Sequence, residues 1–139
     1  MKFAIGAPGL SRYQIMADSW ADRLAPGDMQ RICRRFESIG FDSIDAPEHL
    51  ALDARLVADM GARWPHAIAA MAFFAGATER MLVNSSVIVL PLHHPIALAK
   101  ALATLDMLTC GRTMVSVGLD MARRSSGARR GLSRAGAHR

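Results

Sequence analysis

Two adjacent residues, Glu48 and His49, are the best-suited pair in this chain for acid–base chemistry. A histidine titrates near neutral pH and can act as a general acid or base, while a neighbouring carboxylate can bind a hydroxyl group or tune the site. Neighbouring side chains of an extended segment often point apart, however. Spacing alone therefore favours a structural histidine beside a helix cap or a surface charge, and His49 is a candidate catalytic residue on its chemistry only.

A polar segment, Asn84-Ser85-Ser86, interrupts a run that is otherwise rich in valine and isoleucine. Polar side chains at this point have two explanations. The strand either bulges or meets a local hydrogen bond there, or it approaches a cofactor closely. The residues alone leave both interpretations open.

The remaining reactive side chains predict no further site. His93 and His94 cannot easily face one ion, and no third ligand is suitably spaced, so we expect histidines in a loop or at the start of a helix and no metal site. Cys33 falls on an apolar helix face and Cys110 in a turn, and neither has a base motif. The segment Gly6-Ala7-Pro8-Gly9 lacks the glycine pattern of a dinucleotide fold and the lysine of a phosphate-binding loop.

Strands and helices alternate along the chain and must position these residues. Apolar runs predict strands. Helices are predicted where apolar residues recur on one side, and Asp28, Pro65 and Pro95 lie near the expected helix starts. The expected strands are 2–7, 41–46, 81–90 and 113–117, and the expected helices are 28–39, 67–77 and 95–108. The fold class is therefore α/β, with a parallel sheet of about four β-α units. Loops are expected at 10–27 and 47–63, and the ligand site at the carboxyl ends of the strands.

Composition and charge exclude several classes of protein. The 139 residues are 51% hydrophobic and 21% charged, which suits one globular domain, but a complete eight-fold barrel needs roughly 250 residues. Residues 121–139 hold six arginines and no acid, whereas the rest of the chain holds 11 basic and 12 acidic residues. A nucleic-acid partner is therefore not expected for the folded part. The chain begins without a secretion signal and has no good membrane span, so we expect a cytoplasmic protein.

Several blocks resemble the bacterial luciferase-like oxidoreductases, and most of all their coenzyme F420-dependent branch. These blocks are Gly40-Phe41-Asp42-Ser43-Ile44 with Pro47-Glu48-His49, Ala77-Thr78-Glu79-Arg80-Met81, and Leu90-Pro91-Leu92-His93-His94-Pro95-Ile96-Ala97-Leu98-Ala99-Lys100, which continues to Arg112. The resemblance implies the amino-terminal half of a TIM (β/α)8 barrel over residues 1–118. It implies hydride transfer between the deazaflavin F420 and an unknown small-molecule substrate. The alternative is an FMN-dependent monooxygenase of the same family.

Carried over by position, the resemblance also implies site residues. Glu48 would bind near the polar edge of the deazaflavin ring and His49 would be the active-site acid or base. Ser85, Ser86 and Val87 would form the cofactor-binding bulge, with a non-proline cis peptide between Ser86 and Val87 behind the ring.

The resemblance ends after Gly118, where the family would continue with four more strand–helix units. Residues 119–139 are accordingly expected to be a disordered or frame-shifted tail, and the half-barrel to be inactive alone. Open sheet edges predict self-association or a homo-oligomer. The alternative from another class is a non-enzymatic folded remnant whose basic tail binds polyanions.

Overall fold

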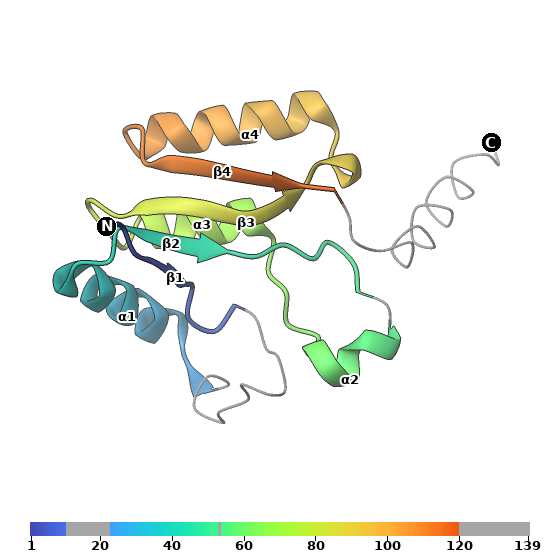
Figure 1. Cartoon of the computed structure of the whole chain (residues 1–139), viewed down its shortest axis with the longest axis horizontal. Coiled ribbons are helices and arrows are strands. Elements are labelled where there is room, and N and C mark those ends of the chain that lie inside the picture. Colours follow the sequence, from blue (N-terminus) through green and yellow to red (C-terminus); the bar gives the residue numbers. More distant parts are fainter. Residues whose placement is uncertain (11–22, 53, 120–139) are drawn as a thin grey trace.

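Four parallel strands form one sheet in the order of the sequence (Figure 1). The computed structural model describes residues 1–10, 23–52 and 54–119. The strands are β1 (Ala4–Gly6), β2 (Ser43–Ala46), β3 (Leu82–Val89) and β4 (Thr113–Gly118). The predicted α/β fold with a parallel sheet is confirmed. The expectations for residues 120–139 and for residues 11–22 of the predicted loop 10–27 lie outside the described residues.

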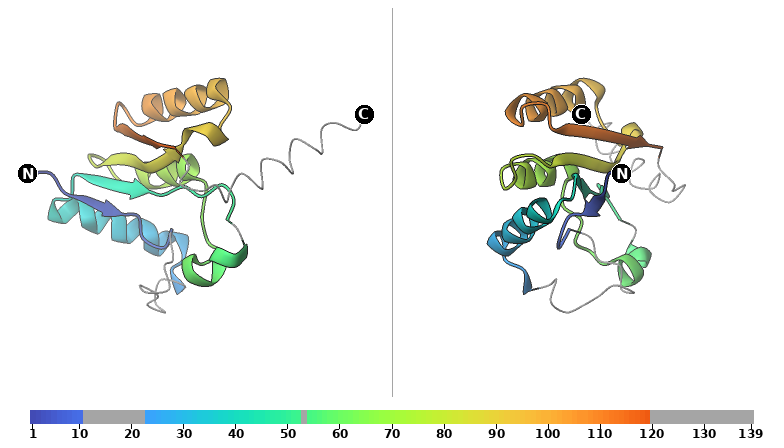
Figure 2. Two further views of the ribbon diagram at one scale, coloured as in Figure 1. Left: turned by 45° about the vertical axis from the view of Figure 1, so that its right-hand side comes forward. Right: turned by 60° about the vertical axis from the view of Figure 1, so that its left-hand side comes forward.

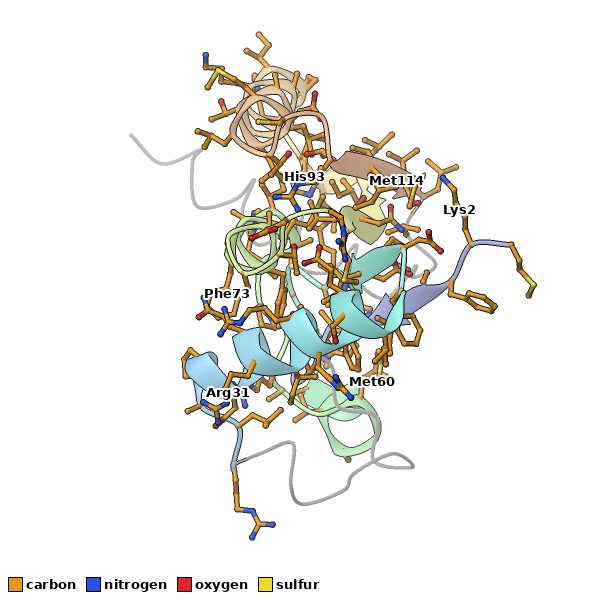
Figure 3. The ribbon with its side chains drawn as sticks, turned by 90° about the vertical axis from the view of Figure 1, so that its left-hand side faces the viewer. Lys2, Arg31, Met60, Phe73, His93 and Met114 are labelled. Atoms are coloured by element: carbon orange, nitrogen blue, oxygen red, sulfur yellow. The ribbon has the colours of Figure 1, made fainter. Side chains whose placement is uncertain are left out.

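Helices connect the strands and cover one face of the sheet. They are α1 (Pro26–Ile39), α2 (Val57–Met60), α3 (Ala67–Ala75) and α4 (Pro95–Leu108), with 3-10 turns at Ala54–Leu56 and Leu90–Leu92. Figure 2 shows α1, α3 and α4 on the same side of the strands. We call the other side the helix-free face. In Figure 3, His93 is seen between α3 and α4, and Met114 lies on β4 toward the opposite side.

Helix α1 begins three residues earlier than expected from an Asp28 cap. Ala25 is the N-cap, Pro26 occupies the first turn, and the Asp28 carboxylate accepts a 2.9 Å hydrogen bond from the Ala25 N–H. The prediction of Asp28 as the cap is wrong because proline fits the first helical position and an acid in the first turn can bond back to the cap. Gly40, at φ +100°, ends the helix as predicted.

Two other boundaries differ from the sequence prediction. Residues 47–63 were expected to be a loop but contain the 3-10 turn Ala54–Leu56 and the single helical turn of α2. One turn is too short to show an apolar period, so the pattern could not reveal it. Helix α3 also ends at Ala75, two residues before the predicted end.

The core lies between the helices and the sheet. Val83 and Cys33 are completely buried, and Phe74, Met71 and Ile44 are at most 2% exposed. Burial raises the pKa of the Cys33 thiol to about 12, against the weaker lowering effect of the Arg34 charge. The prediction of a core cysteine is confirmed.

A line of polar side chains crosses three strands on the helix-free face. Asp45 and Asn84 are register partners, so their side chains share a face. The amide of Asn84 donates to Asp45 Oδ1 at 3.0 Å, and the Ser116 hydroxyl donates to Asn84 Oδ1 at 3.1 Å. We call these three residues the polar row. It links β2, β3 and β4 through side chains as well as backbone bonds.

Two charged side chains, Glu37 and Arg112, form hydrogen bonds to the segments that precede β3 and β4. The Glu37 carboxylate accepts hydrogen bonds from the N–H groups of Glu79, Arg80 and Met81 at 2.6–3.2 Å. Although burial alone would raise the pKa of this carboxyl group, the N–H donors and the Arg80 charge hold it below its ordinary value. The guanidinium of Arg112 donates to four oxygen atoms between Ala75 and Thr109.

Candidate functional site

The carboxyl ends of the four strands meet at one rim, because all four strands are parallel. Glu48 and His49 follow β2, the segment Ser86–Val87 lies near the end of β3, and Gly118 ends β4. The rule that placed the candidate site at the carboxyl ends of the strands therefore brings Glu48, His49 and the Ser86–Val87 segment to one rim. Their individual surroundings differ sharply.

Glu48 is a buried carboxylate that bonds across the rim rather than to its sequence neighbour. It is 4% exposed, and its Oε2 atom accepts from the Val89 N–H at 3.0 Å and lies 2.8 Å from His93 Nε2. Its Oε1 atom is buried and has no hydrogen-bond partner within the described part of the chain. The interpretation of Glu48 as a surface charge is therefore wrong.

His49 occupies a different environment from Glu48. Its ring packs edge-to-face against Trp64, with 4.3 Å between ring centroids, and the Trp64 indole donates to the Gly61 carbonyl at 3.1 Å. The segment that carries Trp64 lies in the connection between β2 and α3, part of which was expected to be loop. His49 is thus held at the rim by a neighbour that sequence reasoning did not single out.

Strand β3 is irregular where the polar segment was noted. Its register with β4 shifts between Ser85 and Ile88, and the Ser86–Val87 peptide bond is cis, as the resemblance implied. Ser86 and Val87 are exposed, Val87 by 40%. A Cβ atom on Gly118 would lie 2.8 Å from Val87 Cγ2, so the glycine leaves the room that this valine occupies.

Ser85 differs from the two residues that follow it. It is completely buried, and its hydroxyl donates to the Ser116 carbonyl at 2.9 Å and accepts from the Ser116 N–H at 3.0 Å. Both hydrogen-bonding functions therefore join β3 to β4. Of the four residues predicted to bind a cofactor, Glu48 and Ser85 are buried, and only Ser86 and Val87 present side chains at the surface of the rim.

His93 is the residue that sequence reasoning underestimated. It was expected to be a histidine at the start of a helix, yet it pairs with a carboxylate 45 residues away and lies 6.2 Å from the His66 ring. The available signal was its position after β3, because Glu48 follows β2 and both ends reach the same rim. Within residues 1–10, 23–52 and 54–119, no group of three His, Cys, Asp or Glu side chains could hold a metal ion.

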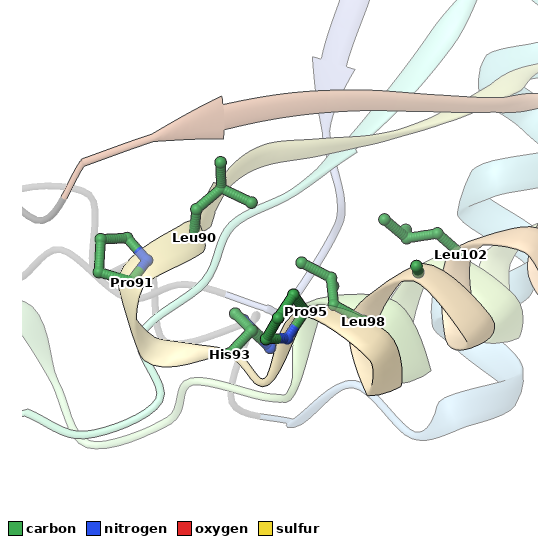
Figure 4. A pocket seen from close by; sticks show the side chains of 7 residues that line it. Leu90, Pro91, His93, Pro95, Leu98 and Leu102 are labelled. Atoms are coloured by element: carbon green, nitrogen blue, oxygen red, sulfur yellow. The ribbon is translucent and has the colours of Figure 1, made fainter.

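An open apolar hollow of ≈ 620 Å³ adjoins His93 (Figure 4). It lies between the 3-10 turn after β3 and the first half of α4, and it is lined by Leu90, Pro91, His93, Pro95, Leu98, Ala99 and Leu102. The His93 side chain is only 11% exposed, although it lines this open hollow, and its Nε2 atom lies against the buried Glu48 carboxylate. No helix of the described segments is long and apolar enough to cross a membrane.

Comparison with known proteins gives consistent matches. Residues 1–120 match the family described as luciferase-like monooxygenase. An F420-dependent glucose-6-phosphate dehydrogenase of Kribbella flavida is 33% identical over 99 residues, which are 70% of this chain and 28% of that protein. The chain therefore spans less than a third of this curated relative.

Solved structures share the fold. The oxygenating constituent of 3,6-diketocamphane monooxygenase from Pseudomonas putida, in complex with FMN, superposes with a TM-score of 0.67 at 18% identity, covering 92% of this chain and 32% of that one. An F420-dependent secondary alcohol dehydrogenase, in complex with an F420–acetone adduct, gives a TM-score of 0.58 at 24% identity, covering 84% and 31%.

Proposed function

The chain belongs to the luciferase-like monooxygenase family, and we propose that its rim is the ring-binding part of an F420-dependent oxidoreductase. The reaction would be hydride transfer between the deazaflavin and a small organic substrate. The described residues supply four parallel strands and the helices that connect them, and we propose that the full activity needs more chain than they provide.

One observation carries this proposal. At the carboxyl end of β3, Ser86 and Val87 protrude at the register shift, between the buried Glu48 of one neighbouring strand end and Gly118 of the other. An exposed valine offers an apolar surface for one face of a planar ring, and a nearby hydroxyl offers a polar contact. A deazaflavin ring has a flat face that can pack against Val87 and a polar edge that can bond to the hydroxyl of Ser86. The residues present therefore fit this cofactor.

The remaining candidate residues have proposed roles that follow from their positions. F420 supplies the hydride chemistry when it is bound. We propose that His49, held against Trp64, is the acid or base that moves a proton at the substrate. Glu48 would define the polar side of the ring site from its buried position, and Ser85 would contribute by holding β3 against β4.

FMN is the alternative ring. The fold is shared with an FMN-bound monooxygenase constituent as well as with an F420-dependent dehydrogenase, and both cofactors have a planar ring that Val87 could contact. The curated relative of higher identity is named for F420, which is why we favour the deazaflavin.

A pair of titrations tests the proposal. The full chain is titrated with F420 and, separately, with FMN, and binding is followed by cofactor fluorescence. We expect saturable binding that favours F420. Gly118→Ala should weaken it about tenfold, or ~1.4 kcal/mol, because the new methyl group displaces Val87.

Gly27→Ala is the matched control. Its added methyl group would meet only Arg31 Nη1, at 4.0 Å, and no atom of Glu48, His49, Ser86 or Val87 lies within that distance. Affinity should remain within about twofold of the unmodified chain, which is less than 0.5 kcal/mol. Tighter binding of FMN would favour the alternative cofactor. A folded chain that binds neither cofactor would refute the proposed function.

A further inference from the structure

We propose that His93 is a positioning residue of the rim: it holds the Glu48 carboxylate against the Val89 amide and so fixes the end of β3 relative to the segment that carries His49. The proposal rests on the proposed function in one respect, since it takes the rim to be the ring site. The bridge itself consists of three residues from two strand ends. Glu48 Oε2 lies 3.0 Å from the Val89 nitrogen and 2.8 Å from His93 Nε2.

The bridge lies where the backbone ladder has stopped. The register of β2 with β3 ends at the pair Ala46 and Ser85. Past that pair, β3 passes through its irregular segment, and β2 continues into Pro47 and Glu48. The carboxylate therefore extends the connection between the two strand ends beyond the last backbone pair. Val89 is two residues after Val87, and Glu48 directly precedes His49, so the bridge sets the spacing between the two candidate groups.

Burial makes the bridge depend on His93. The Glu48 side chain is fully buried, and Oε1 has no partner within the described residues, so both of its hydrogen bonds are made at Oε2. A buried carboxylate is tolerated only when it is paired and hydrogen-bonded. When Glu48 is ionised its oxygen atoms only accept, and Nε2 of His93 then donates to Oε2. Without that donor, one backbone N–H would remain to stabilise the whole charge.

The His93 ring has apolar and aromatic neighbours besides Glu48. One side of the ring adjoins the apolar hollow, with Leu98 on α4 nearby, and the His66 ring lies 6.2 Å away in an edge-to-face arrangement. His94, the next residue, is exposed and directly precedes α4. The two histidines of this turn therefore differ in role, although their chemistry is identical.

Variants of His93 test the proposal by changing the length of the side chain and by removing its N–H donor. His93→Leu removes the donor, and His93→Gln keeps an amide donor near the Nε2 position. His93→Asn keeps the same amide but is too short to reach Glu48. His94→Leu is the matched control for a histidine lost from the same turn. The measurements are F420 affinity by fluorescence and hydrogen exchange of the Val89 amide by NMR.

The expected pattern separates positioning from general stability. His93→Leu and His93→Asn should each weaken F420 binding about tenfold and accelerate Val89 exchange about tenfold. His93→Gln should stay within about threefold of the unmodified chain in both measurements, and His94→Leu should change neither. Rescue by glutamine but not by asparagine identifies the reach to Glu48 as the cause.

Other results overturn the proposal. The proposal is wrong if a folded His93→Leu chain has unchanged F420 affinity and unchanged Val89 amide exchange. It is also wrong if His93→Gln and His93→Asn lose F420 affinity and Val89 protection equally. If His93→Leu does not fold, the comparison of Gln with Asn decides. If the unmodified chain binds no cofactor, the proposed function fails separately. Val89 exchange then decides the bridge, because faster exchange in His93→Asn supports it and unchanged exchange refutes it.

Discussion

Replacing Arg112 should destabilise the fold more than replacing any exposed arginine of the described residues. Its Nη2 donates to the Ala75 carbonyl at 3.0 Å and its Nε to the Thr109 carbonyl at 3.1 Å. Its Nη1 bonds to the Met81 carbonyl at 3.0 Å and to the Thr78 hydroxyl at 3.2 Å. One side chain therefore joins the end of α3, the turn before β3 and the end of α4.

The magnitude follows from these four bonds. A hydrogen bond contributes about 0.5–1.5 kcal/mol net, and bonds that share one group do not add fully. We therefore expect Arg112→Ala to lower the free energy of unfolding by about 2–4 kcal/mol. Arg112→Lys keeps the charge but not the planar fork, so it should still cost about 1–2 kcal/mol.

Urea unfolding followed by circular dichroism measures the effect. With a slope of about 2 kcal/mol per molar urea, the midpoint for Arg112→Ala should fall by about 1–2 M. Arg35→Ala is the control, because Arg35 is exposed and its side chain makes one long bond to Ser38 at 3.4 Å. A loss below about 1 kcal/mol, or a lysine variant as stable as the unmodified chain, would refute the reasoning.

Three further predictions follow from charge, burial and exposure. The lowered pKa of Glu37 means that its stabilisation is complete above the ordinary pKa of about 4.3 and is lost as pH falls through the lower folded value. Urea unfolding at pH 6, 4.5 and 3.5 should therefore show the stability gap to Glu37→Gln narrowing toward low pH, and a constant gap would contradict this. Cys110 is exposed and should react with a thiol reagent at pH 8 within minutes, whereas the buried Cys33 should react only after unfolding. Rapid labelling of native Cys110→Ser would contradict the burial argument. β4 is an uncharged edge strand among the described residues, and its Val117 is 52% exposed, so we expect concentration-dependent self-association that Val117→Lys reduces. Sedimentation showing only a 15.0 kDa species at high concentration would refute the expectation.

Much of the fold could be predicted because its signals are local. The apolar period of α1, the valine-rich run of β3 and Pro95 at the start of α4 each report the state of their own segment. The order of strands and helices then limits the topology to a parallel sheet. The wrong start of α1 also has a local cause. The carboxylate of Asp28 can serve either as the N-cap or as a residue of the first turn that bonds back to the cap.

The site was less accessible to sequence reasoning because its contacts join distant segments. Glu48 and His93 lie 45 residues apart, and the signal that both follow strand ends at the same rim does not specify that their side chains pair. Ser85 and Ser86 have the same side chain, but the strand places one in the interior and the other at the surface. Which serine faces a ligand depends on the position of the register shift, and a pattern of residue types does not encode that position.

The polar row has a consequence for how the sheet assembles. A slip of β3 by one residue would carry Asn84 to the helix side, where Val83 packs, and would turn Val83 toward the helix-free face. The amide would then lose both Asp45 and Ser116 while entering an apolar layer. A one-residue slip of β3 is therefore unfavourable on both faces of the sheet at once, because it buries an amide among apolar side chains and exposes a valine that packs in the core.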